Sequence, residues 1–358
     1  MVAIKTPRRP AEMCLHRAIQ FAVLAGIATA LAAPLPSQAQ EKVLNLYSAR
    51  HYQTDEALYS DFTKQTGIKI NRIEAGDEQL LQRLVAEGAN SPADVLLLVD
   101  AARLWRAQAD GLFQAVESKV LNERIPAQLR SSDNTWFGFS TRARAIVYNK
   151  ANVKPEDVDT YEELADPKNK GKVCTRSGSH PYMLSLIGSR VDTMGEAGAE
   201  QWAKGIVTNM ARPPSGGDTD QIKAVAAGEC GVAVINTYYW VRLLRSIDPK
   251  DQDVVGKVGF VWPNQAGTGT HVNVSGGGVA KNSPNKANAI AFLEYLSSAA
   301  AQNYFANGNN EFPVAKGATL NNPALSSLGS FKQEQVPISS IAKNTVVAQR
   351  ILDRVGYK

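Results

Sequence analysis

The segment ADVLLLVD, residues 93–100, is the feature that most restricts the fold of this chain. Its apolar run VLLLV has no polar alternation, which is typical of a strand buried on both faces of a parallel sheet. Two strand patterns precede it, KVLNLYSA at 42–49 and IKINRIE at 68–74, and helix patterns at 55–66 and 77–88 separate the three strands. This βαβαβ order predicts a parallel sheet flanked by helices, with binding sites beyond the carboxyl ends of the strands.

The second half of the chain repeats this alternation. Strand patterns begin in GKVCTRSG (171–178), CGVAVINTYYW (230–240), VGFVWP (258–263) and HVNVSGGGVA (271–280), and residues 284–306 are predicted to form one long helix. The chain is longer than one hydrophobic core usually serves. We therefore expect an α/β protein with two domains, each a mainly parallel sheet flanked by helices.

Strand-like segments near residues 141–148 and 268–274 are the expected crossings between the two domains. Crossings of this kind permit hinge closure. The predicted domains are residues 40–143 with 269–319 for the N-terminal domain, and residues 144–268 with 320–358 for the C-terminal domain.

Residues 1–39 have the three-part pattern of a secretory signal peptide. Four bases and one acid lie in 1–17, an apolar stretch follows at 18–33, and the segment ends in Ser-Gln-Ala. We expect cleavage after Ala39 and export to the periplasm. Removal of this segment leaves 35 basic and 33 acidic residues, from totals of 39 and 34. A nucleic-acid partner is not expected, because the nearly neutral mature chain keeps no basic stripe to neutralise phosphates.

The mature chain contains two cysteines, Cys174 and Cys230. In an oxidising compartment such a pair favours one disulfide, which here would close a long loop. The alternative is two buried thiols.

Tyr238 and Tyr239 stand side by side in INTYYWVRLL (235–244), where a strand pattern stops and a helix pattern starts. Consecutive strand residues point to opposite faces, so the backbone has to turn here if both phenols are to enter one cleft. Asn236 and Thr237 are suitable turn or cap residues. Ferric ion is a hard ion that prefers anionic oxygen. Free tyrosine titrates at about pH 10, so the phenols become ligands at neutral pH when a metal displaces their protons.

Two other strand-to-helix connections carry related side chains. SARHYQTDE (48–56) holds His51 and Tyr52, and SGSHPYMLS (177–185) holds Tyr182. Three connections then offer an imidazole or a phenol to one region, which favours a metal site. The alternative is structural: an aromatic start to a helix for the tyrosine pair, a solvated loop for His51, and a cover over a sheet edge for Tyr182.

The chain resembles the periplasmic ferric-ion-binding proteins of bacterial ATP-driven iron importers over essentially the whole mature length. The blocks that carry the resemblance, in the family's order, are LNLYSARHY, PADVLLLVDAARLW, WFGFSTRARAIVYNK, CTRSGSHPY, NTYYW, FLEYLSSAAAQNYFANGNNEFPV and ILDRVGYK. Each block is ordinary alone, but together with the tyrosine pair they make a specific match. The resemblance implies a type II-like periplasmic binding protein fold that closes like a hinged clamp over one Fe(III).

The resemblance also implies a ligand set. It assigns Tyr238 and Tyr239 as ligands, matches Tyr182 and Tyr52 to further tyrosine ligands, and places His51 where several relatives have a histidine ligand. The carboxylate ligand of some relatives has no obvious counterpart here. Five protein ligands would leave one octahedral position for a water or a carbonate. The family further implies delivery of the iron to an ABC permease in the inner membrane. We expect a monomer.

Charged and polar residues near these connections suggest further roles. Arg103 and Arg142 are candidate cations that stabilise the phenolates, and their alternative is a surface ion pair. The turn formed by Ser177, Gly178 and Ser179 precedes a helix, where free N–H groups bind carbonate or phosphate. We expect His180 in a loop and His271 nearer the domain crossing than the metal.

Two other function classes are possible. A solute-binding protein of the same fold for a small organic anion or sugar would use Trp105, Trp136, Arg142 and the turn at 177–179, but it would leave the tyrosine cluster unused. A secreted enzyme is disfavoured, because the sequence lacks G-x-S-x-G, H-E-x-x-H and C-x-x-C motifs and Ser275 lacks a convincing base partner.

Overall fold

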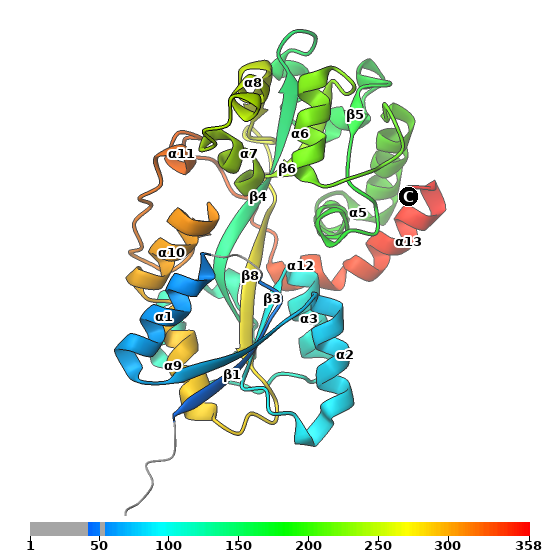
Figure 1. Ribbon diagram of the computed structural model, residues 1–358. Helices are drawn as coiled ribbons and strands as arrows, with labels where there is room; N and C mark the ends of the chain where they lie inside the picture. The colour runs from blue at the N-terminus through cyan, green and yellow to red at the C-terminus, as the bar shows by residue number, and fades with distance from the viewer. Residues whose placement is uncertain (1–41, 51–53) are drawn as a thin grey trace, which may run out of the picture. The chain divides into compact units, whose positions relative to one another are not determined.

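The computed structural model describes residues 42–50 and 54–358. The predicted signal peptide, residues 1–39, and the predicted ligands His51 and Tyr52 therefore lie outside the described residues. Strands and helices alternate through the described chain (Figure 1). In those residues no helix combines the length and the apolar character that a membrane span requires.

The first three strands form the parallel sheet that the sequence predicts. Strand β1 (Val43–Ser48) lies between β2 (Lys69–Glu74) and β3 (Val95–Val99), and both pairings are parallel. Helix α1 (Asp55–Thr66) connects β1 to β2, and α2 (Asp77–Glu87) follows β2. The first four residues of β3 are buried, which explains why its sequence has no polar alternation.

Two long strands extend this sheet into the second half of the molecule. The strand order is β2-β1-β3-β8-β4-β6-β5, and β7 and β9 also pair with β4. The bounds are β4 (Phe137–Asn149), β5 (Val173–Cys174), β6 (Val232–Asn236), β7 (Val258–Val261), β8 (Val272–Val279) and β9 (Phe312–Pro313). β5 runs parallel to β6, whereas β4 is antiparallel to each of its neighbours. We expected a mainly parallel sheet, but the sheet is mixed. The long strands β4 and β8 are antiparallel to each other and to the strands beside them.

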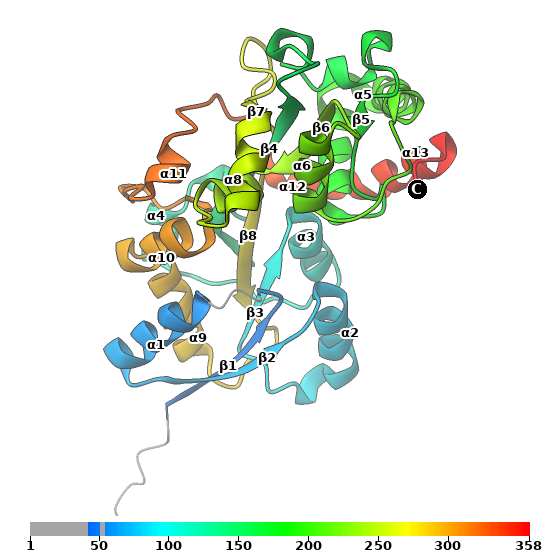
Figure 2. The same cartoon turned by 45° about the horizontal axis from the view of Figure 1, so that its top comes forward.

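Strand β4 contains the first predicted crossing, 141–148, and β8 overlaps the second, 268–274, only from Val272 onwards. Their register pairs Arg142 with Asn273 and Ala143 with Val272, and from Arg144 onwards β4 pairs with β6 instead. Figures 1 and 2 show both strands running between the two groups of helices. The continuous strand β4 therefore belongs to two sheets, and different helices pack on each of them.

The remaining helices cover these sheets. Their bounds are α3 (Ala101–Ala109), α4 (Lys119–Arg124), α5 (Pro181–Asn209), α6 (Asp218–Ala227), α7 (Thr237–Leu244), α8 (Pro249–Lys257), α9 (Lys286–Leu296), α10 (Ala299–Asn309), α11 (Pro323–Ser326), α12 (Ile338–Lys343) and α13 (Thr345–Val355), with 3-10 turns η1 (Gly88–Asn90), η2 (Ala127–Leu129), η3 (Pro155–Asp157), η4 (Glu162–Ala165) and η5 (Pro167–Asn169). Helices α1 and α9 lie on one side of the first sheet, and α2 and α3 lie on the other (Figure 1).

The prediction of a single helix at 284–306 is wrong. Helix α9 ends at Leu296, and Ser298 caps a separate helix α10 by accepting a hydrogen bond from the Ala301 N–H at 3.3 Å. Serine competes for backbone hydrogen bonds and therefore favours helix ends over interiors. The apolar periodicity continues on both sides of Ser297 and Ser298, so it gave no sign that the helix ends there.

Three clusters of buried apolar side chains form the cores. The largest contains Phe62, which packs edge-on against Phe292 with ring centroids 5.0 Å apart, and it surrounds β1, β3 and α9. The other two lie on opposite faces of the β4–β6 pair, so the adjacent residues Ile146 and Val147 belong to different clusters. Separate cores agree with a two-domain α/β fold. The domain boundaries themselves stay a prediction.

The predicted disulfide is confirmed. Cys174 ends β5 and Cys230 precedes β6, and their Cα atoms are 5.8 Å apart. The bond closes a loop across a sequence separation of 56 residues. Because α5 and α6 lie within this loop, the cross-link restricts the unfolded state of the segment that carries Tyr182.

Candidate metal centre

Tyr238 and Tyr239 lie in the first turn of α7, directly after β6. Asn236 ends the strand in an extended conformation, and Thr237 begins the helix. Residues that follow each other in a helix are about 100° apart around its axis, so the change from strand to helix brings both phenols to one side. Their ring centroids are 4.2 Å apart. Tyr238 is 2 % exposed, while Tyr239 is only partly buried.

Tyr182 reaches the same place from another helix. It lies in the first turn of α5, where Pro181 is the first helical residue. Its phenol oxygen is 2.9 Å from that of Tyr238. Two oxygens that lie about 2 Å from one octahedral ion, at right angles to each other, are about 2.8 Å apart. The structure thus brings together three predicted ligands, Tyr182, Tyr238 and Tyr239. The separation of the Tyr182 and Tyr238 oxygens is that of a hydrogen bond, and it is also compatible with two neighbouring ligands of one ion.

Guanidinium groups surround these phenols. The Cζ atoms of Arg142, Arg144 and Arg176 lie 6.0, 5.7 and 5.2 Å from the Tyr182 ring centroid, and that of Arg242 lies 5.5 Å from the Tyr239 ring centroid. Nearby positive charge stabilises a phenolate over a phenol. Positive charge therefore gathers around Tyr182 and Tyr239.

Sequence reasoning identified Arg142 but missed Arg144 and Arg176. Arg142 and Arg144 are two residues apart on β4, so they share one face of the strand, and the spacing in TRARA could have signalled the pair. Arg142 donates to the Ser275 hydroxyl at 2.5 Å, and its Nη1 is 3.7 Å from the buried carboxylate of Glu311. Both arginines of β4 are almost completely buried, so neither forms a surface ion pair.

Asp218, which sequence reasoning also missed, fixes two of these cations. Its carboxylate is fully buried and pairs with Arg144 at 2.6 Å and with Arg176 at 3.4 Å. It also accepts the Asn236 N–H at 2.7 Å, which ties it to the end of β6. Burial acts to lower the pKa of Arg176, but Asp218, followed by Tyr239 and Tyr182, outweighs it and raises that pKa. Arg176 therefore remains a fixed positive charge beside the phenols.

His180 lies in the turn before α5, as expected, and is the N-cap residue of that helix. Its Nδ1 accepts the Tyr182 N–H at 3.2 Å, and its ring meets the Tyr182 ring edge-on at 4.4 Å. Burial, followed by the charges of Arg176, Arg144 and Arg103, lowers the pKa of His180 to about 3. A neutral imidazole that accepts at Nδ1 carries its proton on Nε2, so neither nitrogen offers a free lone pair to a metal.

Arg103 lies on α3 and forms an ion pair with Glu78 at 2.9 Å. Arg106 approaches the same carboxylate at 3.3 Å. The ion pair is partly exposed, which matches the surface alternative for Arg103. Its charge nevertheless acts on His180. A role for Arg103 beside the metal stays a prediction.

Some of the hydrogen-bonding groups at the turn 177–179 that could bind an anion are already used within the protein. The Gly178 N–H donates to the Lys358 carbonyl at 2.8 Å, and the hydroxyls of Ser177 and Ser179 contact each other at 3.0 Å. The Tyr182 N–H, at the helix start, already donates to His180. These two amides are engaged, so an anion at this turn would have to displace existing hydrogen bonds. The Gly178 N–H is therefore engaged, and the anion site stays a prediction.

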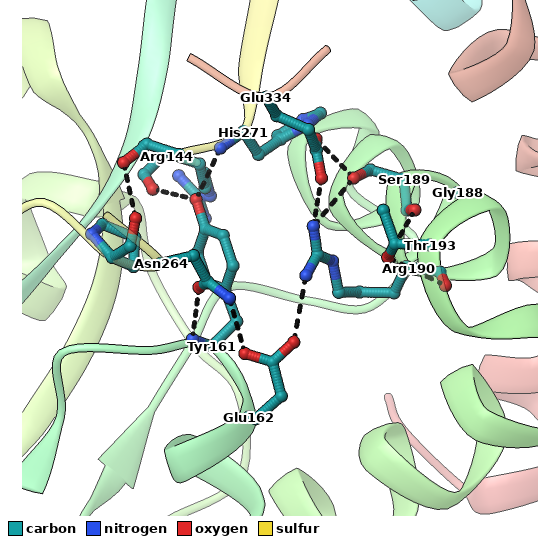
Figure 3. Close-up of polar contacts among 12 residues, drawn as sticks. Arg144, Tyr161, Glu162, Gly188, Ser189, Arg190, Thr193, Asn264, His271 and Glu334 are labelled. Atoms are coloured by element: carbon teal, nitrogen blue, oxygen red, sulfur yellow. Dashed lines mark hydrogen bonds and ion pairs between the residues drawn. The ribbon is translucent and has the colours of Figure 1, made fainter. Parts of the chain in front are cut away.

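His271 lies at the crossing, as the sequence suggested, within a buried polar network (Figure 3). Its Nδ1 is 3.1 Å from Glu334, which also pairs with Arg190 of α5. Its backbone N–H donates to the Tyr161 hydroxyl at 3.1 Å, and that hydroxyl donates to the Arg144 carbonyl. The network thus joins β4, the residue before β8, α5 and the segment before α12.

The residues that flank His51 and Tyr52 are firmly held. Arg50 is buried and pairs with Asp55 at 2.9 Å and with Glu311 at 3.3 Å. The Thr54 hydroxyl contacts the Asn309 side chain. Their interactions anchor both ends of the connection, and the ligand roles of His51 and Tyr52 stay predictions.

The two tryptophans that an organic-solute site would use differ in their exposure. Trp136 is fully buried, and its indole N–H donates to the Gln108 side chain at 2.8 Å. It is therefore part of the core and has no free face on which a solute could stack. Trp105 packs at the edge of the largest cluster. This arrangement weakens the alternative of a sugar or organic-anion site.

Comparison with known proteins places the chain among transport proteins. Residues 47–303 match the family described as bacterial extracellular solute-binding protein. The chain is 51 % identical over 326 residues to "Iron uptake protein A1" of Synechocystis sp., covering 91 % of this chain and 90 % of that protein. It is 28 % identical over 351 residues to the "Major ferric iron-binding protein" of Neisseria meningitidis serogroup B, covering 96 % and 100 % of the two chains.

Solved structures give the same result. The Trichodesmium protein IdiA (FutA), solved in complex with iron and citrate ligands, matches with a TM-score of 0.85 and 54 % identity, covering 88 % of this chain and 100 % of that chain. The ferric binding protein from Campylobacter jejuni matches with a TM-score of 0.83 and 41 % identity over the same shares. The fold that these similarities support is the two-domain α/β fold of periplasmic binding proteins.

Proposed function

Because the chain belongs to the bacterial extracellular solute-binding protein family, we propose that its solute is the ferric ion, held by tyrosines at the start of α5 and α7. The observation that carries the proposal is the 2.9 Å separation between the phenol oxygens of Tyr182 and Tyr238, which come from two different helices. The iron-binding names of the Synechocystis, Neisseria and Trichodesmium proteins support the same solute.

The chemistry of the site suits a trivalent cation. Each phenol gives up its proton when the metal binds, and three phenolates balance a charge of +3, which lowers the cost of burying the ion. The guanidinium groups around Tyr182 favour its deprotonated form. A neutral sugar would use none of these charges. The arrangement therefore selects a hard cation that prefers anionic oxygen.

The proposed ligands are Tyr182, Tyr238 and Tyr239 from the C-terminal domain, with Tyr52 and His51 from the N-terminal domain. A sixth octahedral position is left for a water or a small anion such as carbonate. Since ligands come from both domains, metal binding and domain closure form one equilibrium: only the closed form completes the coordination shell.

The proposed role is binding and delivery, not catalysis. After cleavage of the signal peptide at 1–39, the monomeric protein would capture iron in the periplasm and pass it to an ABC permease in the inner membrane. Release would follow from domain opening, from protonation of the phenolates, or from reduction, because Fe(II) gains less from anionic oxygen.

A visible absorption spectrum tests the proposal. The mature protein is stripped of metal and titrated with chelated Fe(III), beside a Tyr238→Phe, Tyr239→Phe double variant. We expect a broad phenolate-to-iron charge-transfer band that saturates at one equivalent and is lost in the variant. A folded wild-type protein that develops no band would rule out the tyrosine iron site and favour an organic solute.

A further inference from the structure

Arg245 joins two parts of the molecule that have separate hydrophobic cores. It is the C-cap residue of α7, the helix whose first turn carries Tyr238 and Tyr239. Its Nη1 donates to the Asn307 carbonyl and to the Asn310 side-chain oxygen, each at 2.6 Å. Both acceptors lie at the C-terminal end of α10. The contact therefore connects the tyrosine helix to a helix of the other core.

The two helices share no apolar cluster. Trp240 and Leu243 of α7 belong to the cluster that contains Ile235, whereas Ala301 and Phe305 of α10 belong to the large cluster around β1 and β3. A motion that moves α7 away from the end of α10 would therefore have to break the hydrogen bonds of Arg245.

Both ends of the contact are well held. The Gln252 amide of α8 donates to the Leu243 carbonyl at 3.2 Å and to the Ser246 carbonyl at 2.6 Å, which fixes the end of α7. Asn310 adopts a left-handed conformation with φ of 59°, and its side-chain oxygen also accepts from Asn322 at 3.0 Å. A guanidinium is well suited to this position, because the last carbonyls of a helix lack helical partners and carry partial negative charge.

The end of α10 also contacts the start of α1. The Asn309 amide donates to Asp55 at 2.9 Å, and Thr54 contacts the Asn309 side-chain oxygen. A Cβ atom on Gly308 would lie 2.8 Å from the Cβ of Thr54, so the approach requires glycine. The turn that ends α10 is thus packed against the first residues of α1 on one side and bonded to Arg245 on the other.

From these contacts we infer that Arg245 is a positioning residue that holds the tyrosine helix α7 against the end of α10 and slows the release of the bound metal. The inference rests on the proposed ferric function, because it deepens the account of how that site stays closed. This role requires no contact between Arg245 and the phenols or the metal. It acts by stabilising the arrangement in which the two cores lie together, so its loss changes how long iron stays bound and leaves the iron chromophore intact.

The test compares Arg245→Ala with Arg350→Ala. Arg350 is exposed on α13, so this control removes the same side chain at a distance from α7 and α10. Each protein is loaded with Fe(III), and the decay of the charge-transfer band is followed in excess chelator. We expect the wild-type band and stoichiometry in both variants, but roughly three- to tenfold faster release from Arg245→Ala, as fits the loss of hydrogen bonds from a charged, solvent-exposed donor.

An Asn310→Gly variant tests the partner. Glycine accepts the left-handed backbone of this position and removes the side-chain oxygen, so it should also speed release. Combined with Arg245→Ala, it should add less than its separate effect, since the two residues share one interaction. Release from Arg245→Ala at the wild-type rate would overturn the inference and leave the ferric site standing. A wild-type protein without the band would overturn the ferric site and this inference with it.

Discussion

The phenol oxygens of Tyr182 and Tyr238 lie 2.9 Å apart, although the two residues are 56 positions apart in the sequence. Each tyrosine stands in the first turn of a helix that follows a strand, β5 for Tyr182 and β6 for Tyr238. Since β5 and β6 are parallel neighbours, their carboxyl ends lie at the same edge of the sheet. The fold thus converts two separate sequence motifs into one site.

Removal of the Tyr182 hydroxyl should weaken iron binding strongly. Tyr182→Phe takes away one proposed anionic ligand and the hydrogen-bond partner of Tyr238. Loss of an outer partner of a ligand already costs about 10- to 100-fold in metal affinity, so we expect the loss of a ligand to cost at least about 100-fold. Competition with a chelator measures the affinity. Tyr148→Phe on β4 removes a hydroxyl elsewhere and should bind normally; wild-type affinity in Tyr182→Phe would show that Tyr182 is not a ligand.

Loss of the Arg176 charge should shift the pH dependence of iron loading. Its guanidinium lies 5.2 Å from the Tyr182 ring centroid and acts on Tyr182 and Tyr239. Without it, phenolates are less favoured and protons compete better with the metal. For Arg176→Gln we expect the pH at half-maximal band intensity to rise relative to the wild type and to an Arg350→Gln control. An unchanged or lower midpoint would contradict a role for Arg176 in stabilising phenolates.

His180 should make the metal-free protein less stable in acid. Burial, followed by Arg176, lowers its pKa from 6.5 to about 3 in the folded state. Between these values the unfolded chain binds a proton that the folded chain does not, so stability decreases as the pH falls from 6.5 towards 3.

A variant with a non-titrating cap isolates this effect. His180→Asn keeps an acceptor for the Tyr182 N–H but binds no proton. Urea unfolding of the metal-free protein at several pH values should therefore show a shallower loss of stability below pH 6.5 in His180→Asn than in the wild type. Equal slopes would mean that His180 does not titrate with a lowered pKa in the folded protein.

The polar network at the crossing should contribute substantially to stability. Glu334 is buried and contacts Arg190, Ser189 and His271 (Figure 3). Burial acts to raise the pKa of Glu334, but His271 and Arg190 outweigh it and lower that pKa. Glu334→Gln removes one of the two carboxylates that pair with the buried Arg190 and leaves Glu162, at 3.2 Å, as the other. We therefore expect a loss in the free energy of unfolding below the about 3–5 kcal/mol that a fully unpaired buried charge costs.

The sign of the pH dependence provides a second check on Glu334. Because the folded-state pKa is lowered, its stabilisation is present at neutral pH and is lost as the pH falls below the ordinary value of 4.5. Urea unfolding should thus show a large difference between wild type and Glu334→Gln at neutral pH and a smaller one in acid. Glu123→Gln, at an exposed ion pair on α4, should change little. A difference that stays constant with pH would mean that the charge of Glu334 is not what stabilises the network.

Sequence alone determined the local features of this protein. The βαβαβ order, the strands in the crossing segments, the disulfide between Cys174 and Cys230 and the turn at Tyr238 could all be predicted. These features depend on residue spacing, on backbone preferences within a few positions, and on the small number of cysteines. The break between α9 and α10 is also local, but the apolar periodicity on both sides of Ser298 concealed it.

Only the tertiary structure decided which side chains meet. Arg144, Arg176 and Asp218 became part of the site because β4, the turn before α5 and α6 converge there, and no local pattern specifies that convergence. The same holds for Gly178, because its N–H donates to the carbonyl of Lys358, which is distant in the sequence. Electrostatic and hydrogen-bonding partners are chosen by proximity in space, so the sequence supplies the candidates and the packing of the whole chain selects among them.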